Sequence, residues 1–214
     1  MKKLITITAL MLATAGAYAQ DYAAKLTEAF TTLNTTQDFQ EKINQSNKLS
    51  LIAKKYNTDW APAYYAALGK IFISYEEKDN AKKDAYLDDA DLLVEQATKA
   101  AGKMNDELHV VTAMAANARL AVNPEKRWQK YGKIFEDNLE KAKALNADNP
   151  RIYYLKGTTL FFTPKMWGGG KDKALEYFNK ATPLFDKEED GDISKPYWGK
   201  EANDYFIGEC KKGE

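Results

Sequence analysis

The sequence predicts an all-α fold in which antiparallel helix pairs stack into a right-handed α-solenoid. Apolar residues recur at spacings of three and four along most of the chain, and capping residues separate these stretches at short intervals. The stretches also resemble one another in where small and bulky residues fall, which is typical of helical repeats. Residues 71–75 and 151–155 have some strand propensity, but both lie inside longer helical periodicity, so strands are the weaker alternative.

The first two predicted helices cover residues 22–34 and 37–57, and Thr35 with Asp38 resembles a capping box at the start of the second. The next helix, 60–77, has a single apolar stripe. Its members are Trp60, Tyr64, Ala67, Leu68, Ile71, Phe72 and Tyr75. Residues 80–101 form its partner, and Gly102 follows as a suitable C-terminal cap.

Asparagine caps predict the helices of the second half. Asn105 precedes a helix that runs to Val122, and Asn123-Pro124 ends that helix and begins another that runs to Leu145. Proline is well tolerated at the first helical position because its missing N–H would have no helical partner there. The same dipeptide recurs at Asn149-Pro150 and begins a shorter helix to Phe161. Residues 171–186 and 199–212 complete four pairs and a terminal cap.

The helix pairs share two features that indicate an internal repeat. The second helices carry apolar residues at offsets of four and seven, and the first helices carry a small residue eight positions after the cap, which lets two backbones approach closely. The apolar sets are Ala90, Val94, Ala97; Phe135, Leu139, Ala142; and Ala174, Phe178, Ala181. The small residues are Ala67, Ala113 and Gly157.

The run from Asn149 to Ala181 resembles a tetratricopeptide repeat, although the interval between Gly157 and Ala174 is longer than in the common unit. Together with Pro196-Tyr197-Trp198-Gly199 and Cys210, it is similar to small exported tetratricopeptide-like proteins of Bacteroidota-type bacteria. That resemblance implies a concave groove lined by the first helices. Transferred through the small residues, it points to exposed partner-binding positions Tyr64, Leu68, Glu107, Val110, Asn117, Arg151, Tyr154 and Thr158. For Tyr64 and Tyr154, burial in the core is an equal alternative.

Residues 1–19 have the basic start, short apolar run and Ala17-Tyr18-Ala19 ending of a cleavable signal peptide, so we expect an exported, most simply periplasmic, protein. An amphipathic first helix is the weaker alternative. Residues 20–214 then form a single domain without a membrane span. Basic and acidic residues are equal in number, at 31 each, which argues against nucleic-acid binding.

Few residues suggest chemistry. The Trp167-Gly168-Gly169-Gly170 segment could cradle an anion, but a tight connection with Trp167 packed on the core is the simpler interpretation. His109, the single histidine, and Cys210, the single cysteine, are expected to be structural. The acidic segment 188–192 could bind calcium weakly, but lacks the full spacing of a calcium loop. We therefore predict no metal, no cofactor and no enzymatic activity.

The favoured function is a non-catalytic scaffold that binds a protein or peptide in its groove. The alternative is capture of a small ligand or glycan in connection with solute uptake, which the abundance of tyrosine, with 13 residues, would suit. An enclosed pocket with two or more exposed aromatic residues would favour this alternative over an open groove.

Overall fold

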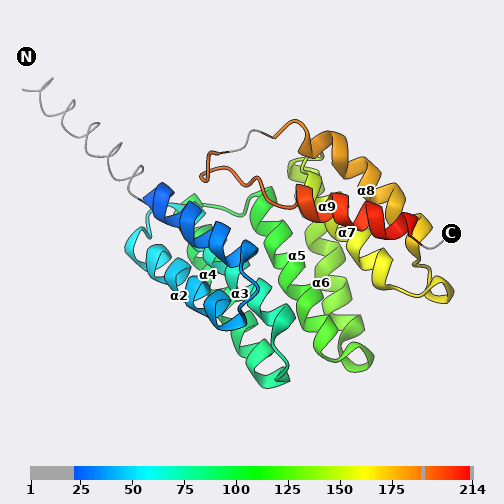
Figure 1. The fold of residues 1–214 in the computed structure, drawn as a ribbon, viewed down its shortest axis with the longest axis horizontal. Coiled ribbons are helices and arrows are strands. Elements are labelled where there is room, and N and C mark those ends of the chain that lie inside the picture. Colours follow the sequence, from blue (N-terminus) through cyan, green and yellow to red (C-terminus); the bar gives the residue numbers. More distant parts are fainter. Residues whose placement is uncertain (1–21, 189–190, 213–214) are drawn as a thin grey trace, which may run out of the picture.

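The computed structural model describes residues 22–188 and 191–212, and the regular structure within these ranges is entirely helical. The predicted signal peptide lies outside the described residues. No helix within them is long and apolar enough to cross a membrane. A helix over residues 22–35 comes first. It is followed by α2 (Phe39–Lys55), α3 (Trp60–Glu76), α4 (Asn80–Ala101), α5 (Asp106–Val122), α6 (Pro124–Leu145), α7 (Pro150–Phe162), the short 3-10 helix η1 (Lys165–Trp167), α8 (Lys171–Phe185) and α9 (Lys200–Lys211) (Figure 1).

Side-chain caps begin these helices where the sequence predicts them. Asn105 accepts a hydrogen bond from the Leu108 amide at 2.8 Å, and Asn149 accepts one from the Arg151 amide at 3.0 Å. Such bonds satisfy amides that have no partner within the first helical turn. The capping box expected at Thr35 and Asp38 is wrong in part. Asp38 caps α2 alone, because the preceding helix continues through residue 35.

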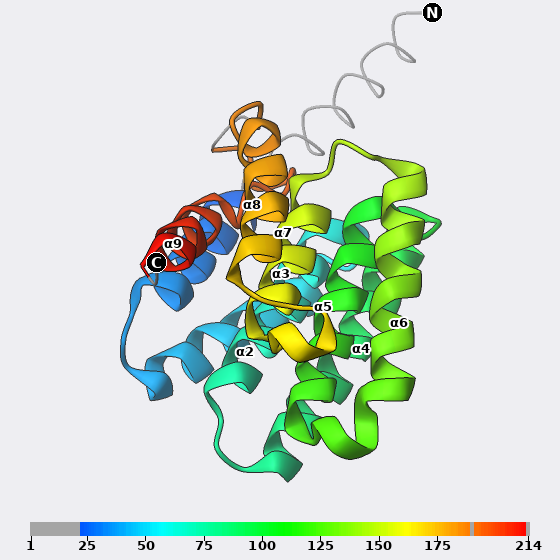
Figure 2. The same cartoon turned by 90° about the vertical axis from the view of Figure 1, so that its right-hand side faces the viewer.

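Consecutive helices form antiparallel hairpins, and the hairpins stack in sequence order. Helix α5 contacts both α3 and α7, so these three form an inner layer, and α4, α6 and α8 are their respective hairpin partners (Figures 1 and 2). The predicted all-α fold of stacked helix pairs is therefore confirmed. The last helix, α9, packs on α8 and also contacts α7. It therefore ends the stack as the predicted cap.

The repeat positions form the contacts between layers. All three apolar sets on α4, α6 and α8 are buried, as are the small residues of α3, α5 and α7. Gly157 shows why a small residue is needed, because a Cβ at this position would lie 2.6 Å from the ring of Phe178. The α7/α8 hairpin thus closes more tightly than any side chain at position 157 would allow.

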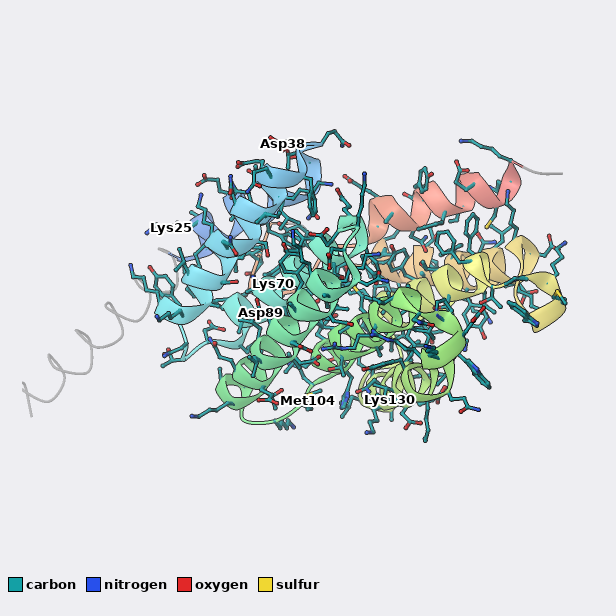
Figure 3. The ribbon with its side chains drawn as sticks, turned by 90° about the horizontal axis from the view of Figure 1, so that it is seen from below. Lys25, Asp38, Lys70, Asp89, Met104 and Lys130 are labelled. Atoms are coloured by element: carbon teal, nitrogen blue, oxygen red, sulfur yellow. The ribbon has the colours of Figure 1, made fainter. Side chains whose placement is uncertain are left out.

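Ion pairs join neighbouring helices at the surface, both within a hairpin and between hairpins. Lys70 on α3 pairs with Asp89 on α4 at 3.2 Å (Figure 3), and Arg119 on α5 binds Asp88 and Asp91 at 2.8 and 2.6 Å. The carboxylates are exposed, so they lie on the solvent-facing side of α4. Each exposed pair contributes at most about 1 kcal/mol, so the apolar contacts between layers supply most of the stability.

Candidate functional site

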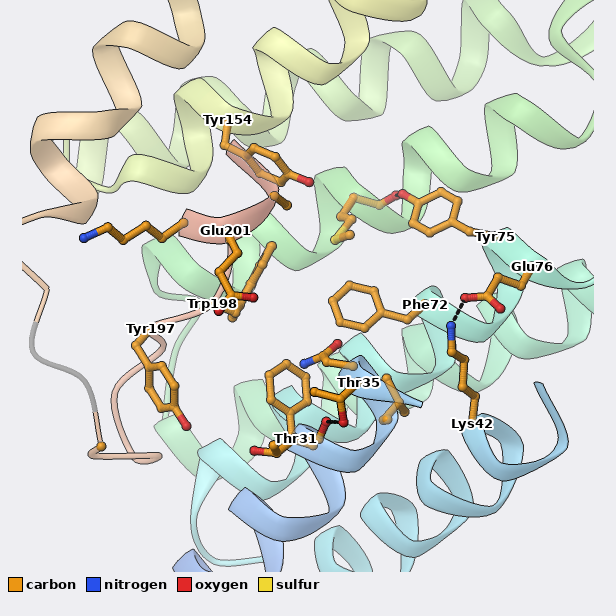
Figure 4. Close-up of a pocket in the computed structure, with 18 residues that line it drawn as sticks. Thr31, Thr35, Lys42, Phe72, Tyr75, Glu76, Tyr154, Tyr197, Trp198 and Glu201 are labelled. Carbon is orange, nitrogen blue, oxygen red and sulfur yellow. Dashed lines mark hydrogen bonds and ion pairs between the residues drawn. The ribbon is translucent and has the colours of Figure 1, made fainter. Parts of the chain in front are cut away.

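A cavity of about 850 Å³ opens on the inner face of the stack, between the helix over residues 22–35 and the start of α9 (Figure 4). The C-terminal half of α3 forms its floor, and single residues of α5 and α7 close one side. Aromatic side chains dominate the lining and come from segments far apart in the sequence. They are Phe30, Phe72, Tyr75, Tyr154, Tyr197 and Trp198.

Helical spacing directs these side chains into the cavity. Phe72, Tyr75 and Glu76 are three and four residues apart, so they share one face of α3. Phe30 lies on the helix opposite, with its ring centroid 6.1 Å from that of Phe72. Tyr154 projects from α7 with its hydroxyl toward the cavity (Figure 4). The inner helices therefore supply one continuous aromatic surface.

Trp198 completes this surface from the segment that precedes α9. Its indole Nε1 donates a 2.6 Å hydrogen bond to the hydroxyl of Tyr64, and its ring stands edge-on to Phe72 and Tyr154 at 6.2 and 6.3 Å. The guanidinium of Arg151 lies 5.1 Å from the centroid of the same ring, within range of a cation–π interaction. Trp198 is only 9% exposed, so these contacts hold its ring in one orientation.

A buried polar network supports Trp198 from behind. The Tyr64 hydroxyl donates to Glu107 at 2.6 Å, and Arg151 binds Glu107 at 3.1 Å and Glu188 through two bonds of 2.7 and 2.9 Å. Burial raises the pKa of Glu107, although the neighbouring Arg151 charge opposes the shift. Because a buried charge is tolerated only when it is paired and hydrogen-bonded, the network stabilises one arrangement of these helices.

Charged groups are confined to the edge of the cavity. Lys42 on α2 forms an ion pair with Glu76 there (Figure 4). Removal of the hydroxyls from water raises the pKa of both Tyr75 and Tyr154, so both phenols are neutral at ordinary pH. The result is a largely aromatic cavity with two cations, Lys42 and Lys200, and two carboxylates, Glu76 and Glu201, in its lining, which suits a flat, largely apolar ligand carrying an acidic group.

His109 lies outside the lining of this cavity. It sits on α5 and its Nδ1 is 2.8 Å from Asn138 Oδ1 on α6. Cys210 is buried in α9, as expected for a small structural residue. No cluster of three or more metal-ligating side chains exists within the described residues. Of the acidic segment, Glu188 is bound to Arg151 and Asp192 accepts from Ser194, whereas residues 189–190 lie outside the described ranges.

The structure places the predicted groove residues mostly inside the protein. Tyr154 lines the cavity, whereas Tyr64, Glu107 and Arg151 meet in the buried network. Leu68 and Val110 are fully buried, and only Asn117 and Thr158 are partly exposed. The expectation that these positions are exposed is therefore wrong for most of them. The segment before α9 folds back over the inner helices and covers the face that would be open in a plain solenoid.

The triple-glycine segment forms the connection between η1 and α8. The amides of Gly168, Gly169 and Gly170 donate to the carbonyls of Lys165, Pro164 and Leu160, so they are not free to bind a ligand. Gly168 and Gly170 have positive φ, which glycine adopts without strain. The expectation that Trp167 packs on the core is wrong, since this side chain is 73% exposed. The backbone hydrogen bonds of the glycines fix the turn, so the turn does not depend on packing of the Trp167 side chain.

Sequence reasoning missed most of the cavity lining. Phe72 and Tyr75 belong to the predicted apolar stripe of α3, but nothing local distinguishes them from core residues. Tyr197 and Trp198 stand in a segment noted only for its family resemblance. Met114 lies one helical position beyond the predicted small residue Ala113. The one available signal is the high number of tyrosines, which suits stacking on a ligand but does not indicate which residues form the site.

Comparisons with known proteins agree with this architecture. No family model matches the chain, and no curated protein matches it in sequence. Among solved structures, the HusA haemophore from Porphyromonas gingivalis is similar, with a TM-score of 0.76 and 30% sequence identity over 89% of this chain and 92% of that chain. These findings support the likeness to helical proteins of Bacteroidota and leave tetratricopeptide identity unconfirmed. The identity and the nearly complete coverage show that the chain belongs to the family of the HusA haemophore.

Proposed function

We propose that this chain is an exported binding protein that holds a porphyrin of the haem type in its aromatic cavity. The observation that carries the proposal is the cavity itself, in which six aromatic residues from four separate segments meet around one space. The similarity to a haemophore points to the same class of ligand. The small-ligand alternative therefore takes precedence over a scaffold for protein partners, and binding without catalysis remains part of the proposal.

The cavity suits a porphyrin in size and in chemistry. Its volume lies within the range of about 300–1,000 Å³ that is typical of small-molecule sites. A porphyrin is a flat aromatic macrocycle with propionates at one edge, so its faces would contact rings such as Phe72 and Trp198. Lys42 at the rim would pair with a propionate in exchange for its ion pair with Glu76. The leader predicted at residues 1–19 would deliver the protein to the compartment in which such a ligand is captured.

Removing Tyr75 from the cavity wall is expected to weaken porphyrin binding about tenfold, since aromatic contacts contribute roughly 0.5–1.5 kcal/mol beyond burial and tenfold equals 1.4 kcal/mol. Tyr75 is 45% exposed, so Tyr75→Ala should leave the fold intact. The affinity is measured by titrating haem and following the Soret band and tryptophan quenching. Tyr177→Ala on α8, outside the cavity, is the matched control. Equal affinities for the two variants would place the ligand elsewhere.

The proposed site has many side chains that can contact the porphyrin ring but few that can ligate the iron. The single histidine is outside the cavity, and the raised pKa values of Tyr75 and Tyr154 disfavour the phenolates that iron ligation requires. Met114 supplies a thioether. We therefore expect metal-free protoporphyrin to bind within about tenfold of haem, and His109→Ala to bind haem as the unaltered protein does. A strong preference for the iron form, lost in His109→Ala, would contradict this mode of binding.

A further inference from the structure

An apolar tip stands at the end of the molecule where α7 and α9 finish. It consists of Phe162, Met166, Trp167 and Tyr205, which are 70%, 82%, 73% and 62% exposed. In Figure 1 the yellow connection after α7 and the C-terminal end of α9 lie at this same end. Soluble proteins rarely leave large apolar side chains together in water without a purpose. Neither the porphyrin cavity nor the repeat contacts use this group.

The tip is held in place by well-ordered contacts. The Trp167 amide donates to the Pro164 carbonyl at 2.9 Å, and the Gly170 amide donates back to the Leu160 carbonyl at 2.9 Å. The ring of Phe206 joins the two parts of the tip, with its centroid 5.9 Å from that of Phe162 and 5.4 Å from that of Tyr205. The chain therefore presents Met166 and Trp167 outward on a turn whose backbone is tied to α7.

Lysines surround this tip. Residues 162–173 and 204–212 contain five lysines and three acidic residues, Asp172, Asp204 and Glu209, of which Asp172 and Glu209 form ion pairs with Lys165 and Lys212. Lys165 and Lys212 have side chains that are 75% and 73% exposed, and Lys171 lies 5.9 Å from the centroid of Phe161. Exposed tryptophan, phenylalanine and tyrosine flanked by lysine is the composition of segments that lie in a membrane interface.

We infer that this tip docks the protein on an anionic lipid surface. Trp167, Met166 and Phe162 enter the boundary between headgroups and acyl chains, and the lysines pair with the lipid phosphates. A projecting tip suits a planar, fluid surface better than a shaped protein partner. The cavity is lined by the first residues of α9, up to Ala202, whereas Met166 and Trp167 lie on the connection that follows α7.

The test is co-sedimentation of the purified protein with vesicles of phosphatidylcholine, with and without phosphatidylglycerol. We expect binding to the anionic vesicles that weakens as salt is added, because exposed charges are screened. Trp167→Ala should bind about tenfold more weakly. Lys211→Gln combined with Lys212→Gln should lower binding to anionic vesicles only. Trp128→Ala, which removes a 59% exposed tryptophan from α6, is the matched control and should bind normally.

Two results would overturn the inference: no binding of the unaltered protein to anionic vesicles, or equal binding by Trp167→Ala and Trp128→Ala. Circular dichroism shows whether each variant is folded. Haem titration of the same samples reports on the cavity separately, so a failure of lipid docking is distinguishable from a failure of porphyrin binding.

Discussion

Arg151→Met is expected to lower the free energy of unfolding by about 3–5 kcal/mol, because it leaves the buried Glu107 without its cationic partner. Arg151 is 1% exposed and makes three bonds to the carboxylates of Glu107 and Glu188. Methionine fills most of the space but cannot neutralise the charge. The measurement is equilibrium unfolding in urea, followed by circular dichroism.

Arg119→Met is the matched control for this prediction. Arg119 is also nearly buried, at 8% exposure, but its partners Asp88 and Asp91 are exposed and become hydrated when it is removed. Its loss should therefore cost about 1 kcal/mol or less from the ion pairs. Adding Glu107→Gln to Arg151→Met should restore part of the lost stability by removing the unpaired charge. If the two arginine variants were equally stable, the network would not have the structural role assigned to it.

The same network links stability to the proposed function. Arg151 lies against the Trp198 ring, and Glu107 holds the tyrosine hydroxyl to which the indole donates. Loss of Arg151 should therefore also weaken porphyrin binding, although the residue does not line the cavity. Tyr64→Phe should weaken binding because it removes the acceptor that orients Trp198, and it should also lower stability because Glu107 and the Trp198 indole each lose a hydrogen-bond partner.

The helices could be predicted from the sequence because their signals are local. An asparagine such as Asn105 or Asn149 caps the turn that immediately follows it, and apolar spacing marks the buried face. These features act within a few residues and do not depend on the rest of the chain. The stacked hairpins follow in turn, since neighbouring apolar stripes have to cover one another.

The cavity could not be predicted in the same way, because it depends on contacts between distant segments. Trp198 and Tyr64 are 134 residues apart, and nothing near either residue shows that they will meet. The resemblance to repeats with an open groove predicted that Tyr64 and Arg151 would be exposed in that groove. The segment before α9 covers them and converts the groove into a smaller cavity further along α3. Tyr154 belongs to both the predicted groove and the observed cavity because it lies where the two overlap.

Gly157→Ala is expected to destabilise the protein by about 1–3 kcal/mol, even though alanine is the better helix former. The new methyl group would lie 2.6 Å from the ring of Phe178, well inside van der Waals contact. That ring is fully buried and stacks on Phe206 with an interplanar angle of 9°, so it cannot move aside cheaply. Overpacking of this kind forces shifts in the helices themselves.

Gly132→Ala on α6 tests whether the effect comes from packing. The nearest atom to a Cβ at position 132 is Leu120 Cδ1, at 3.9 Å, so alanine fits there without a clash. This variant should gain about 0.5–1 kcal/mol from the smaller conformational freedom of its unfolded chain. The two substitutions are chemically identical, and the opposite sign of their effects on the unfolding midpoint is the decisive result.

The Gly157 substitution should also reach the cavity. Phe178 contacts Tyr154, with their ring centroids 6.3 Å apart, and Tyr154 forms part of the cavity wall. A displaced Phe178 therefore pushes on the residue that faces the ligand, and haem affinity should fall together with stability. If Gly157→Ala were as stable as the unaltered protein, α7 and α8 could move apart at little energetic cost. The repeat would then not require a glycine at this position.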